Sequence, residues 1–499
     1  MKYVRVRNSN SKGKPGNGWK YGLTLLFAAL AMTSKSSTVI LPVVLCLCAW
    51  WVEGRWQWRN LARLGPIVLM VVFPSALTLW TQKLGGGEDP QWVRTWPERL
   101  VTMGDEVWFY LGKLLWPYPL MVNYPRWQID ADRWFSYLPL LAVIAVIFVL
   151  WRNLKSWSRP WFFVFAYFLV ALFPVLGLVD IYFQRYAFVA DHFQYLAGMG
   201  PLALAGVGLA QFSDFVVLGR RWLQSSLYAG VLLILGIWSW QRAWVYQSEE
   251  TLWTDTVTKN PNSWLGHYSL GFALLKKGQV DEAIARFQKA LEIQPNCIEA
   301  HTEIAIALFQ KGQVDEAVAQ FQKVLEINPN DVETHDNLGK ILVQKGQVDE
   351  AIIHFQKALK INPNNADVHI HLGDILSKRE RLDEAIAQYQ QALQINPNLV
   401  GVYDSLGNAL IQRGQIDEAI VQFQKALKID PKFVNAHFSL GNVLIQKRQI
   451  DEAMVQYQAS LKINPNFADA HFGLGVALVY KGQMDEAIAQ FQKAVEINP

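Results

Sequence analysis

The chain has 499 residues, of which 52% are hydrophobic and 18% charged, with 21 Trp, 3 Cys and a formal net charge of +4. These averages hide two unlike halves. Residues 1–245 hold 23 Lys and Arg against 11 Asp and Glu, a net +12, while the rest holds 23 against 31, a net −8. This division excludes a single globular domain, a disordered chain and a disulfide framework.

The first half is typical of a polytopic membrane domain. From Tyr21 to Trp240, apolar runs alternate with short charged loops, and several runs approach the roughly 20 residues that a membrane-spanning helix needs. Many of them begin or end at Trp or Tyr, which favour the headgroup region. The clearest predicted spans are Leu64–Trp80, Trp134–Trp151, Trp161–Val179, Tyr195–Phe212 and Gln224–Trp240.

The N-terminal region allows two interpretations. Tyr21–Met32 and Val39–Val52 are each short for a span, and a polar segment containing Lys35 separates them. They predict a tight pair of membrane helices with a break at Lys35, which leaves the number of spans in residues 21–52 open. The alternative is a signal peptide, because a basic leader precedes Ala29-Leu30-Ala31.

Loop charges predict the orientation of the membrane domain. Loops 53–63, 152–160 and 213–223 are rich in Lys and Arg, which places them on the cytoplasmic side. Segments 81–133 and 180–192 mix acidic with basic side chains and are expected outside. The two sets alternate across consecutive spans, so the second half of the chain is predicted to be extracytoplasmic. One miscounted span would make it cytoplasmic instead.

The second half repeats with a period of 34 residues. A Leu-Gly pair recurs in the first half of most units, and Asp-Glu-Ala opens the second half of every unit. A 34-residue period is the signature of tetratricopeptide repeats, in which two antiparallel helices form one unit. The period is marked by Pro261, Pro295, Pro329, Pro363, Pro397, Pro431, Pro465 and Pro499, and the seven units begin at Trp264, Ile298, Val332, Ala366, Val400, Val434 and Ala468.

The predicted fold is therefore all-α: a polytopic transmembrane helical domain followed by a solenoid of seven repeats. Within the repeats, Ala305 replaces the usual Gly, and Glu380 and Arg448 replace an inter-helix Gly. The predicted divisions are a basic cytoplasmic leader over 1–20, the membrane domain over 21–245, a degenerate half-repeat over 246–263 and the repeats over 264–499.

Stacked repeats present a groove lined by their first helices. Positions two, five, nine and twelve of each unit fall on one stripe, away from the core stripe, and are predicted to line that groove. The groove is apolar at both ends and polar or acidic in the middle, which favours an extended polypeptide with some basic character; ordinary surface variation is the alternative. The predicted residues are Tyr268, Phe272, Asp336, Lys340, Asp374, Asp404, Asn408, Phe438, Asn442 and Phe472.

No strong catalytic, phosphate-binding or metal-ligating motif is present, and no cofactor is evident. Lys35 is a candidate because a charge at membrane depth is costly, although it could extend to an interface instead. Arg185, Asp191 and His192 lie among aromatic residues at the predicted outer mouth of two spans. They are candidate catalytic residues, and a structural ion pair in that loop is the alternative. Asp105 and Glu106 lie in an amphipathic segment, 98–115, expected on the outer surface.

Three membrane-domain motifs carry a family resemblance. They are a Leu-x-x-x-Ser34-Lys35 element, Leu115-Trp116-Pro117, and Val189-Ala190-Asp191-His192-Phe193-Gln194-Tyr195-Leu196. Together with the repeats, they resemble the transmembrane and tetratricopeptide-repeat O-mannosyltransferase family and its bacterial relatives, which are GT-C type membrane glycosyltransferases.

The resemblance implies transfer of a sugar from a polyprenyl-phosphate donor to an acceptor protein on the outer face. Asp191 matches the acid of the family's Ala-(Asp/Glu)-Arg-x-x-Tyr-Leu motif, and His192 stands where Arg is usual. A divalent metal is a further possible requirement. The family's acidic loop after the first span has no counterpart here, so we expect a domain truncated at its N-terminus.

Two functional hypotheses follow. The first is a glycosyltransferase-like integral membrane protein whose extracytoplasmic solenoid binds acceptor polypeptides. The second is a non-catalytic, membrane-anchored scaffold that binds proteins. Polypeptides and membrane lipid are the expected partners. Nucleic acid is not expected, because the repeats are acidic and the remaining basic residues serve as topology markers.

Overall fold

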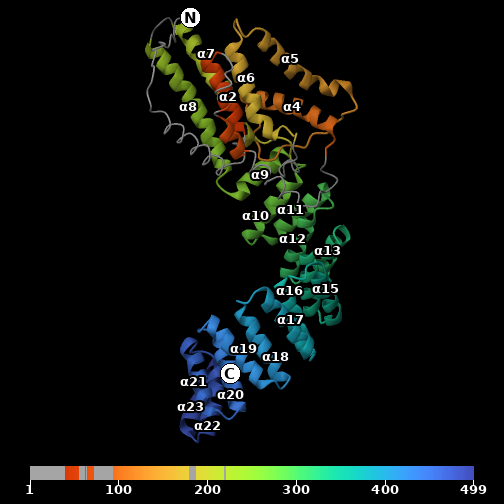
Figure 1. The fold of residues 1–499 in the computed structure, drawn as a ribbon, viewed down its shortest axis with the longest axis vertical. Helices are drawn as coiled ribbons and strands as arrows, with labels where there is room; N and C mark the ends of the chain where they lie inside the picture. The colour runs from red at the N-terminus through yellow and green to blue at the C-terminus, as the bar shows by residue number, and fades with distance from the viewer. Residues whose placement is uncertain are drawn as a thin grey trace. The chain divides into compact units, whose positions relative to one another are not determined.

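A computed structural model describes residues 40–54, 62, 64–71, 94–178, 187–217 and 221–498. Helices form the secondary structure throughout these ranges, and no strand occurs in them, in agreement with the predicted all-α class. The chain divides into two compact units, Met1–Pro295 and Asn296–Pro499, so the first repeat belongs to the N-terminal unit (Figure 1).

The N-terminal unit contains seven described α-helices before its repeat and three single-turn 3-10 helices. They are α2 (Leu41–Glu53), α4 (Trp96–Leu115), η3 (Trp134–Tyr137), α5 (Leu138–Arg152), α6 (Arg159–Leu172), η4 (Phe173–Val175), η6 (Asp191–Phe193), α7 (Gln194–Val217), α8 (Arg221–Val245) and α9 (Glu249–Lys259). The repeat itself consists of α10 (Trp264–Lys276) and α11 (Val280–Ile293).

Among the residues that the structure describes, three helical segments are long and apolar enough to cross a membrane: Trp134–Arg152, Asp191–Ser213 and Trp222–Val245. They coincide with three of the predicted spans. Arg159–Val175 and Leu41–Glu53 are apolar but shorter. The predicted span Leu64–Trp80 is described only up to residue 71, and the predicted helix at 21–32 lies outside the described residues.

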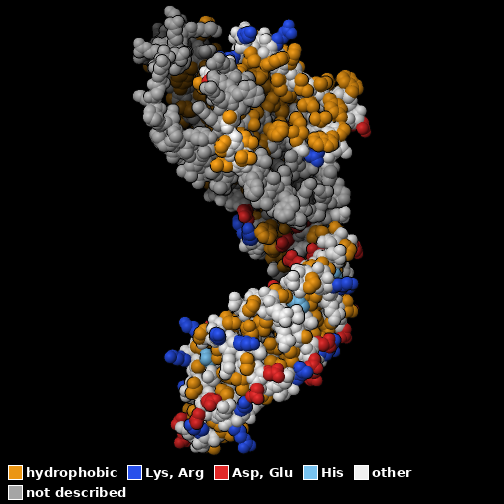
Figure 2. Space-filling view, in the orientation of Figure 1, with side chains coloured by type: hydrophobic (Ala, Val, Ile, Leu, Met, Phe, Trp, Pro, Cys, Tyr) orange, Lys and Arg blue, Asp and Glu red, His pale blue; other side chains and the backbone are white. Residues whose placement is uncertain are grey.

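Apolar side chains cover much of the surface of this unit. On the face shown in Figure 2 they gather over α4, α5 and α6. Along α5, for example, Leu141, Ile144 and Phe148 are all about half exposed or more. Extended apolar surface of this kind marks contact with a membrane or a partner.

The core of the N-terminal unit lies between α4, α6 and the segment before α7. Tyr110, Phe168 and Leu172 are fully buried there. Helices α4 and α5 approach closely at Gly104, where a Cβ atom would stand 2.5 Å from the backbone nitrogen of Leu140. Gly104 therefore allows the two helices to pack backbone against backbone.

The C-terminal unit consists of six repeats, each a pair of antiparallel helices. Their first helices begin at the residues predicted from the sequence. The helices are α12 (Ile298–Gln310), α13 (Val314–Ile327), α14 (Val332–Gln344), α15 (Val348–Ile361), α16 (Ala366–Lys378), α17 (Leu382–Ile395), α18 (Val400–Gln412), α19 (Ile416–Ile429), α20 (Val434–Gln446), α21 (Ile450–Ile463), α22 (Ala468–Tyr480) and α23 (Met484–Ile497).

The Leu-Gly pair explains how each repeat packs. In the third repeat, a Cβ added at Gly339 of α14 would stand 2.5 Å from the ring of Phe355 in α15, and Phe355 is only 1% exposed. The missing side chain thus makes room for the aromatic ring. In the second repeat Ala305 takes the glycine's place and is itself fully buried beside Phe321.

The turn between the two helices of a repeat requires a left-handed residue. Gly346 has φ +75° at this position, whereas Glu380 and Arg448 adopt φ +59° and +62°. Both replacements identified in the sequence therefore keep the turn geometry, at the steric cost that a side chain brings in this region.

Candidate functional site

The predicted groove residues of the C-terminal unit lie on its first helices. We call the surface formed by positions five and nine of α14, α16, α18, α20 and α22 the A face. Most of its polar side chains are half-buried and hydrogen-bonded to neighbours. The members predicted from the sequence are Asp336, Lys340, Asp374, Asp404, Asn408, Phe438, Asn442 and Phe472.

Asp336 is held by two basic neighbours. Its Oδ1 lies 2.8 Å from Nδ1 of His371 in the next repeat, and its Oδ2 lies 3.0 Å from Nζ of Lys340, one turn along α14. Burial acts to raise the pKa of Asp336, but the hydrogen bonds from His371 and Lys340 outweigh it and lower that pKa below its usual value. This carboxylate therefore remains ionised and links two repeats.

Asp374 and Asn442 receive hydrogen bonds from tyrosines of second helices. The hydroxyl of Tyr389 donates to Oδ1 of Asp374 at 2.8 Å, and the hydroxyl of Tyr457 donates to Oδ1 of Asn442 at 2.7 Å. Burial raises the pKa of Tyr457 to about 12, so it remains a donor at neutral pH. In both contacts, a tyrosine of the second helix fixes the position of a polar side chain on the A face.

Asp404 has hydrogen-bonding capacity that the repeats leave unused. Its Oδ2 accepts a hydrogen bond from Nδ2 of Asn408 at 3.1 Å, whereas its Oδ1 has no partner among the described residues. Burial raises the pKa of Asp404, because a carboxylate that loses water contact is harder to ionise, and hydrogen bonds from the side chains of Ser439 and Asn408 offset this only in part. A donor brought by a ligand would relieve this cost when the carboxylate turns toward it.

The apolar ends of the predicted groove fall in both units. In the C-terminal unit, Phe438 packs against Phe467 with ring centroids 5.2 Å apart, and Phe472 is 59% exposed. In the N-terminal unit, Tyr268 packs against Phe287 at 5.7 Å, and the ammonium of Lys276 lies 4.8 Å from the ring centre of Phe272. The four predicted residues Tyr268, Phe272, Phe438 and Phe472 lie on first helices, as expected.

Sequence reasoning missed the residues that support the A face, namely His371, Tyr389 and Tyr457. A signal for the tyrosines was present. Tyr replaces the usual Phe of the second helix in repeats four and six, and in both repeats position nine carries an amide or carboxyl acceptor fifteen residues earlier.

A second candidate site surrounds Asp191 in the N-terminal unit. The carboxylate is 9% exposed, and its Oδ1 accepts a hydrogen bond from the hydroxyl of Tyr124 at 2.6 Å. Its Oδ2 has no hydrogen-bond partner within the described ranges. The side chain borders a cavity of about 190 Å³ lined by Met121, Val122, Asp191, His192, Tyr195, Tyr246 and Leu252.

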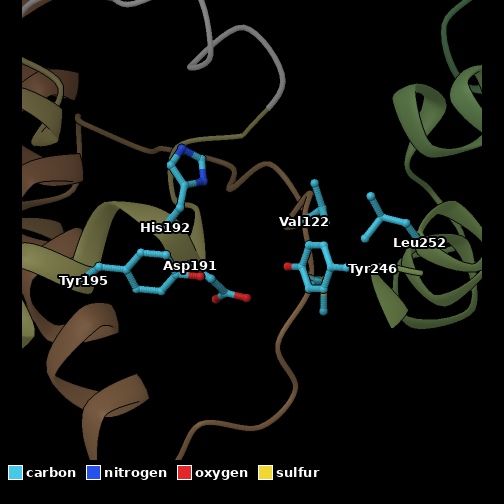
Figure 3. Close-up of a pocket in the computed structure, with 7 residues that line it drawn as sticks. Val122, Asp191, His192, Tyr195, Tyr246 and Leu252 are labelled. Atoms are coloured by element: carbon cyan, nitrogen blue, oxygen red, sulfur yellow. The ribbon is translucent and has the colours of Figure 1, made fainter. Parts of the chain in front are cut away.

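The cavity brings together groups from three parts of the unit. Figure 3 shows the hydroxyls of Tyr195 and Tyr246 directed toward the carboxylate of Asp191, while the imidazole of His192 points away from it. Arg242 donates to Asp255 at 2.8 Å and to the Tyr246 hydroxyl at 3.5 Å. The site is thus a carboxylate with the hydroxyls of Tyr195 and Tyr246 directed toward it, and the guanidinium of Arg242 donates a hydrogen bond to the Tyr246 hydroxyl.

The structure describes two of the four residues that were predicted to be catalytic. Asp191 and His192 border the same cavity, whereas Arg185 and Lys35 lie outside the described residues. Within the described ranges, no group of three or more His, Cys, Asp or Glu side chains is placed to hold a metal ion. The catalytic roles of all four residues stay predictions.

Glu106 of α4 is an acid that sequence reasoning placed at the outer surface, but its side chain is fully buried. Neither of its carboxylate oxygens has a hydrogen-bond partner among the described residues. Burial raises the pKa of Glu106 well above its usual value, and nearby Arg94 lowers it by a smaller amount. The amphipathic helix is present, but Glu106 lies on its buried face.

Comparison with known families identifies the second half of the chain. A model described as TPR repeat matches residues 339–379, 373–412, 407–448 and 441–479, and models described as tetratricopeptide repeat match 274–341 and 468–499. Residues 274–499 are tetratricopeptide repeats. These matches give no support for a glycosyltransferase domain, and no curated protein matches the chain.

Several solved structures are similar to the tetratricopeptide-repeat (TPR) part of the chain. MamA is 29% identical over 32% of this chain and 93% of its own, with a TM-score of 0.30. YrrB, described as a TPR protein with an unusual peptide-binding site, is 26% identical over 36% and 92%, with a TM-score of 0.31. PilF of Pseudomonas aeruginosa is 20% identical over 40% and 92%, with a TM-score of 0.36.

Proposed function

We propose that this protein is a membrane-anchored TPR protein that binds an extended polypeptide on its A face. The observation that carries the proposal is the row of half-buried hydrogen-bonding side chains on successive first helices, at Asp336, Asp374, Asp404 and Asn442. An extended peptide offers backbone donors and acceptors at regular intervals, which suits a binding surface that repeats along the solenoid.

The charge of the A face indicates the chemistry of the ligand. Asp336, Asp374 and Asp404 outnumber the one predicted base, Lys340, which Asp336 already engages. Asp404 retains an unsatisfied oxygen. A peptide carrying Lys or Arg would supply charge-assisted hydrogen bonds here, and these are stronger than neutral ones.

The membrane anchor rests on the apolar helices of the N-terminal unit. In the most apolar part of Trp222–Val245, 0% of the residues are buried within the protein, so this surface requires an apolar environment. The loop charges favour an extracytoplasmic solenoid by the positive-inside rule. Protease protection of the repeats in sealed vesicles tests this orientation.

The binding proposal predicts that Asp404→Asn weakens peptide binding at least about tenfold, because a charged hydrogen bond contributes roughly 1.5–3 kcal/mol. Short fluorescent peptides, enriched from a random phage-displayed library on the full chain in detergent, provide the probe. Fluorescence anisotropy measures their affinity, and the enriched peptides are expected to be rich in Lys and Arg.

Asp417→Asn is the matched control for this experiment. Asp417 lies on a second helix, its side chain is 85% exposed, and it pairs only with Lys447 at the surface. It should leave affinity within about twofold, since exposed ion pairs contribute little. Failure to enrich any peptide, or equal effects of the two variants, would rule out A-face binding.

A second candidate function is transfer of a sugar from a polyprenyl phosphate, as the family resemblance implies. The specific observation in its favour is the Asp191 carboxylate beside a cavity of about 190 Å³, a volume suited to a single small group such as a sugar ring. In the proposed step, Asp191 accepts the proton of a Ser or Thr hydroxyl. The hydroxyl oxygen bonds to the anomeric carbon, and polyprenyl phosphate leaves with the bonding electrons.

If this function is correct, Asp191→Asn lowers the transfer rate at least about 100-fold, because general base catalysis contributes roughly that much or more. The assay uses polyprenyl-phosphate mannose labelled in the sugar and Ser/Thr-rich peptides, with the full chain in detergent. Asp132→Asn, at an exposed loop position, should leave the rate unchanged. Absence of transfer by the unmodified protein would exclude this function for that donor.

A further inference from the structure

A histidine lies near the start of nearly every repeat, and we call its hydrogen bonds to the neighbouring backbone and to the second helix the histidine clamp. It occupies position four of the first helix in six of the seven repeats, at His267, His301, His335, His369, His437 and His471. In the fourth repeat, Nε2 of His369 lies 3.0 Å from the carbonyl oxygen of Pro363, and Nδ1 lies 2.7 Å from the side-chain amide of Gln388 on the second helix.

The third repeat departs from this arrangement. Nε2 of His335 lies 3.2 Å from the carbonyl oxygen of Pro329, as in the other repeats, but the position of the glutamine is taken by His354. The two Nδ1 atoms lie 2.9 Å apart, with ring centres separated by 5.1 Å. Helices α14 and α15 are therefore joined by a pair of imidazoles.

The histidine–glutamine contact and the histidine–histidine contact respond differently when an imidazole is protonated. A glutamine amide carries both a donor and an acceptor, so by turning over it can pair with either a neutral or a charged imidazole. Two facing imidazole nitrogens can share one proton. If both rings become charged, two N–H groups and two positive charges face each other at hydrogen-bond distance.

The surroundings of the pair oppose protonation. Burial lowers the pKa of His354 to about 4, with smaller contributions from His335 and from Lys357 on α15. Burial likewise lowers the pKa of His335, and Lys357 lowers it further. The hydrogen bond to the Pro329 carbonyl and the charge of Asp331 at the start of α14 raise it, each by less than burial lowers it. Among the described residues of α13 and α16, on either side, none contributes a charge that shifts either pKa.

We propose that His335 and His354 make the third repeat an acid-sensitive joint of the solenoid: the pair holds one proton between its rings and separates α14 from α15 when both rings are charged. A histidine whose pKa is lowered by folding stabilises the fold fully above its unfolded pKa of about 6.5. That stabilisation is lost as the pH falls from there toward 4. Opening of this repeat would interrupt the A face at Asp336.

Hydrogen–deuterium exchange of the full chain in detergent, corrected for intrinsic rates, tests the joint. Between about pH 7 and pH 5, amides of α14 and α15 should become at least about tenfold less protected, whereas those of α16 and α17 should not. The pKa of His354 alone predicts a factor near 20. We expect at least tenfold and not twentyfold, because the His354 side chain is half-exposed and solvent screens its charge.

Two variants exchange the histidine–histidine and histidine–glutamine contacts between the third and fourth repeats. His354→Gln restores the histidine–glutamine contact of the second, fourth, sixth and seventh repeats and should abolish the extra loss of protection in α14 and α15. Gln388→His installs the imidazole pair in the fourth repeat and should transfer the acid sensitivity to α16 and α17. The proposal would be wrong if His354→Gln left the loss of protection of α14 and α15 between pH 7 and pH 5 unchanged. It would also be wrong if Gln388→His produced no such loss in α16 and α17. The hydrogen bond between Asp336 and His371 persists at pH 5, because the pKa of Asp336 is held below its usual value.

Discussion

Replacement of Glu106 by glutamine is expected to stabilise the N-terminal unit at pH 8, by about 1.4 kcal/mol for each unit by which folding raises the pKa of this carboxyl group. Glutamine keeps the shape of the side chain and removes the need to bury a charge. The unmodified protein should lose stability as the pH rises from the ordinary Glu pKa of about 4.3 through the raised folded-state pKa of Glu106. Glu106→Gln should lack that loss.

Thermal unfolding in detergent, followed by Trp fluorescence at pH 5 and pH 8, measures this effect. Asp132→Asn is the control, since Asp132 lies at an exposed loop position and its removal should change stability little. If Glu106→Gln instead destabilised the protein equally at both pH values, Glu106 would have to be an ionised, paired group.

Replacement of Phe423 by alanine is expected to cost about 3–5 kcal/mol, the range for removing a fully buried aromatic side chain. Phe423 of α19 is 0% exposed and packs into the space that Gly407 of α18 leaves free. Repeats contact only their neighbours, so the loss of hydrogen-exchange protection should centre on the fifth repeat.

Val421→Ala on the same helix is the matched control, because Val421 is 46% exposed. It should change stability by less than about 1 kcal/mol. Urea denaturation followed by the helical circular-dichroism signal gives both values. Similar values for the two variants would show that the aromatic–glycine contact does not hold the repeat together.

The repeat boundaries could be predicted from the sequence because they depend on local patterns. The Leu-Gly pair, the Asp-Glu-Ala opening and the proline recur without insertion, and each has a local structural reason. The same logic identified Glu380 and Arg448 as departures, and both occupy the left-handed turn that glycine takes elsewhere. Three apolar runs likewise correspond to helices long enough to span a membrane.

The contacts of the candidate sites could not be predicted in the same way. The helical period placed Asp336, Asp374 and Asp404 on one stripe, but their partners come from other helices. His371 reaches Asp336 from the next repeat, and Tyr389 reaches Asp374 from the second helix. Pairing across such distances depends on how the helices pack, which a single amphipathic stripe does not specify.

Glu106 illustrates the same limit. On an amphipathic helix a glutamate is expected to face water, yet Thr102, Glu106 and Tyr110 follow one another at four-residue intervals and all three are fully buried. A helical wheel identifies such a stripe but does not say which side the remaining helices will cover.

The sequence alone determined the all-α class, the period and boundaries of the repeats and the apolar character of the first half, because these arise from local propensity and spacing along one helix. Only the tertiary structure decided which side chains meet: the buried Glu106, the cavity at Asp191, the unsatisfied oxygen of Asp404 and the facing imidazoles of His335 and His354. Hydrogen bonding and desolvation act between side chains distant in sequence, so their balance is set by packing.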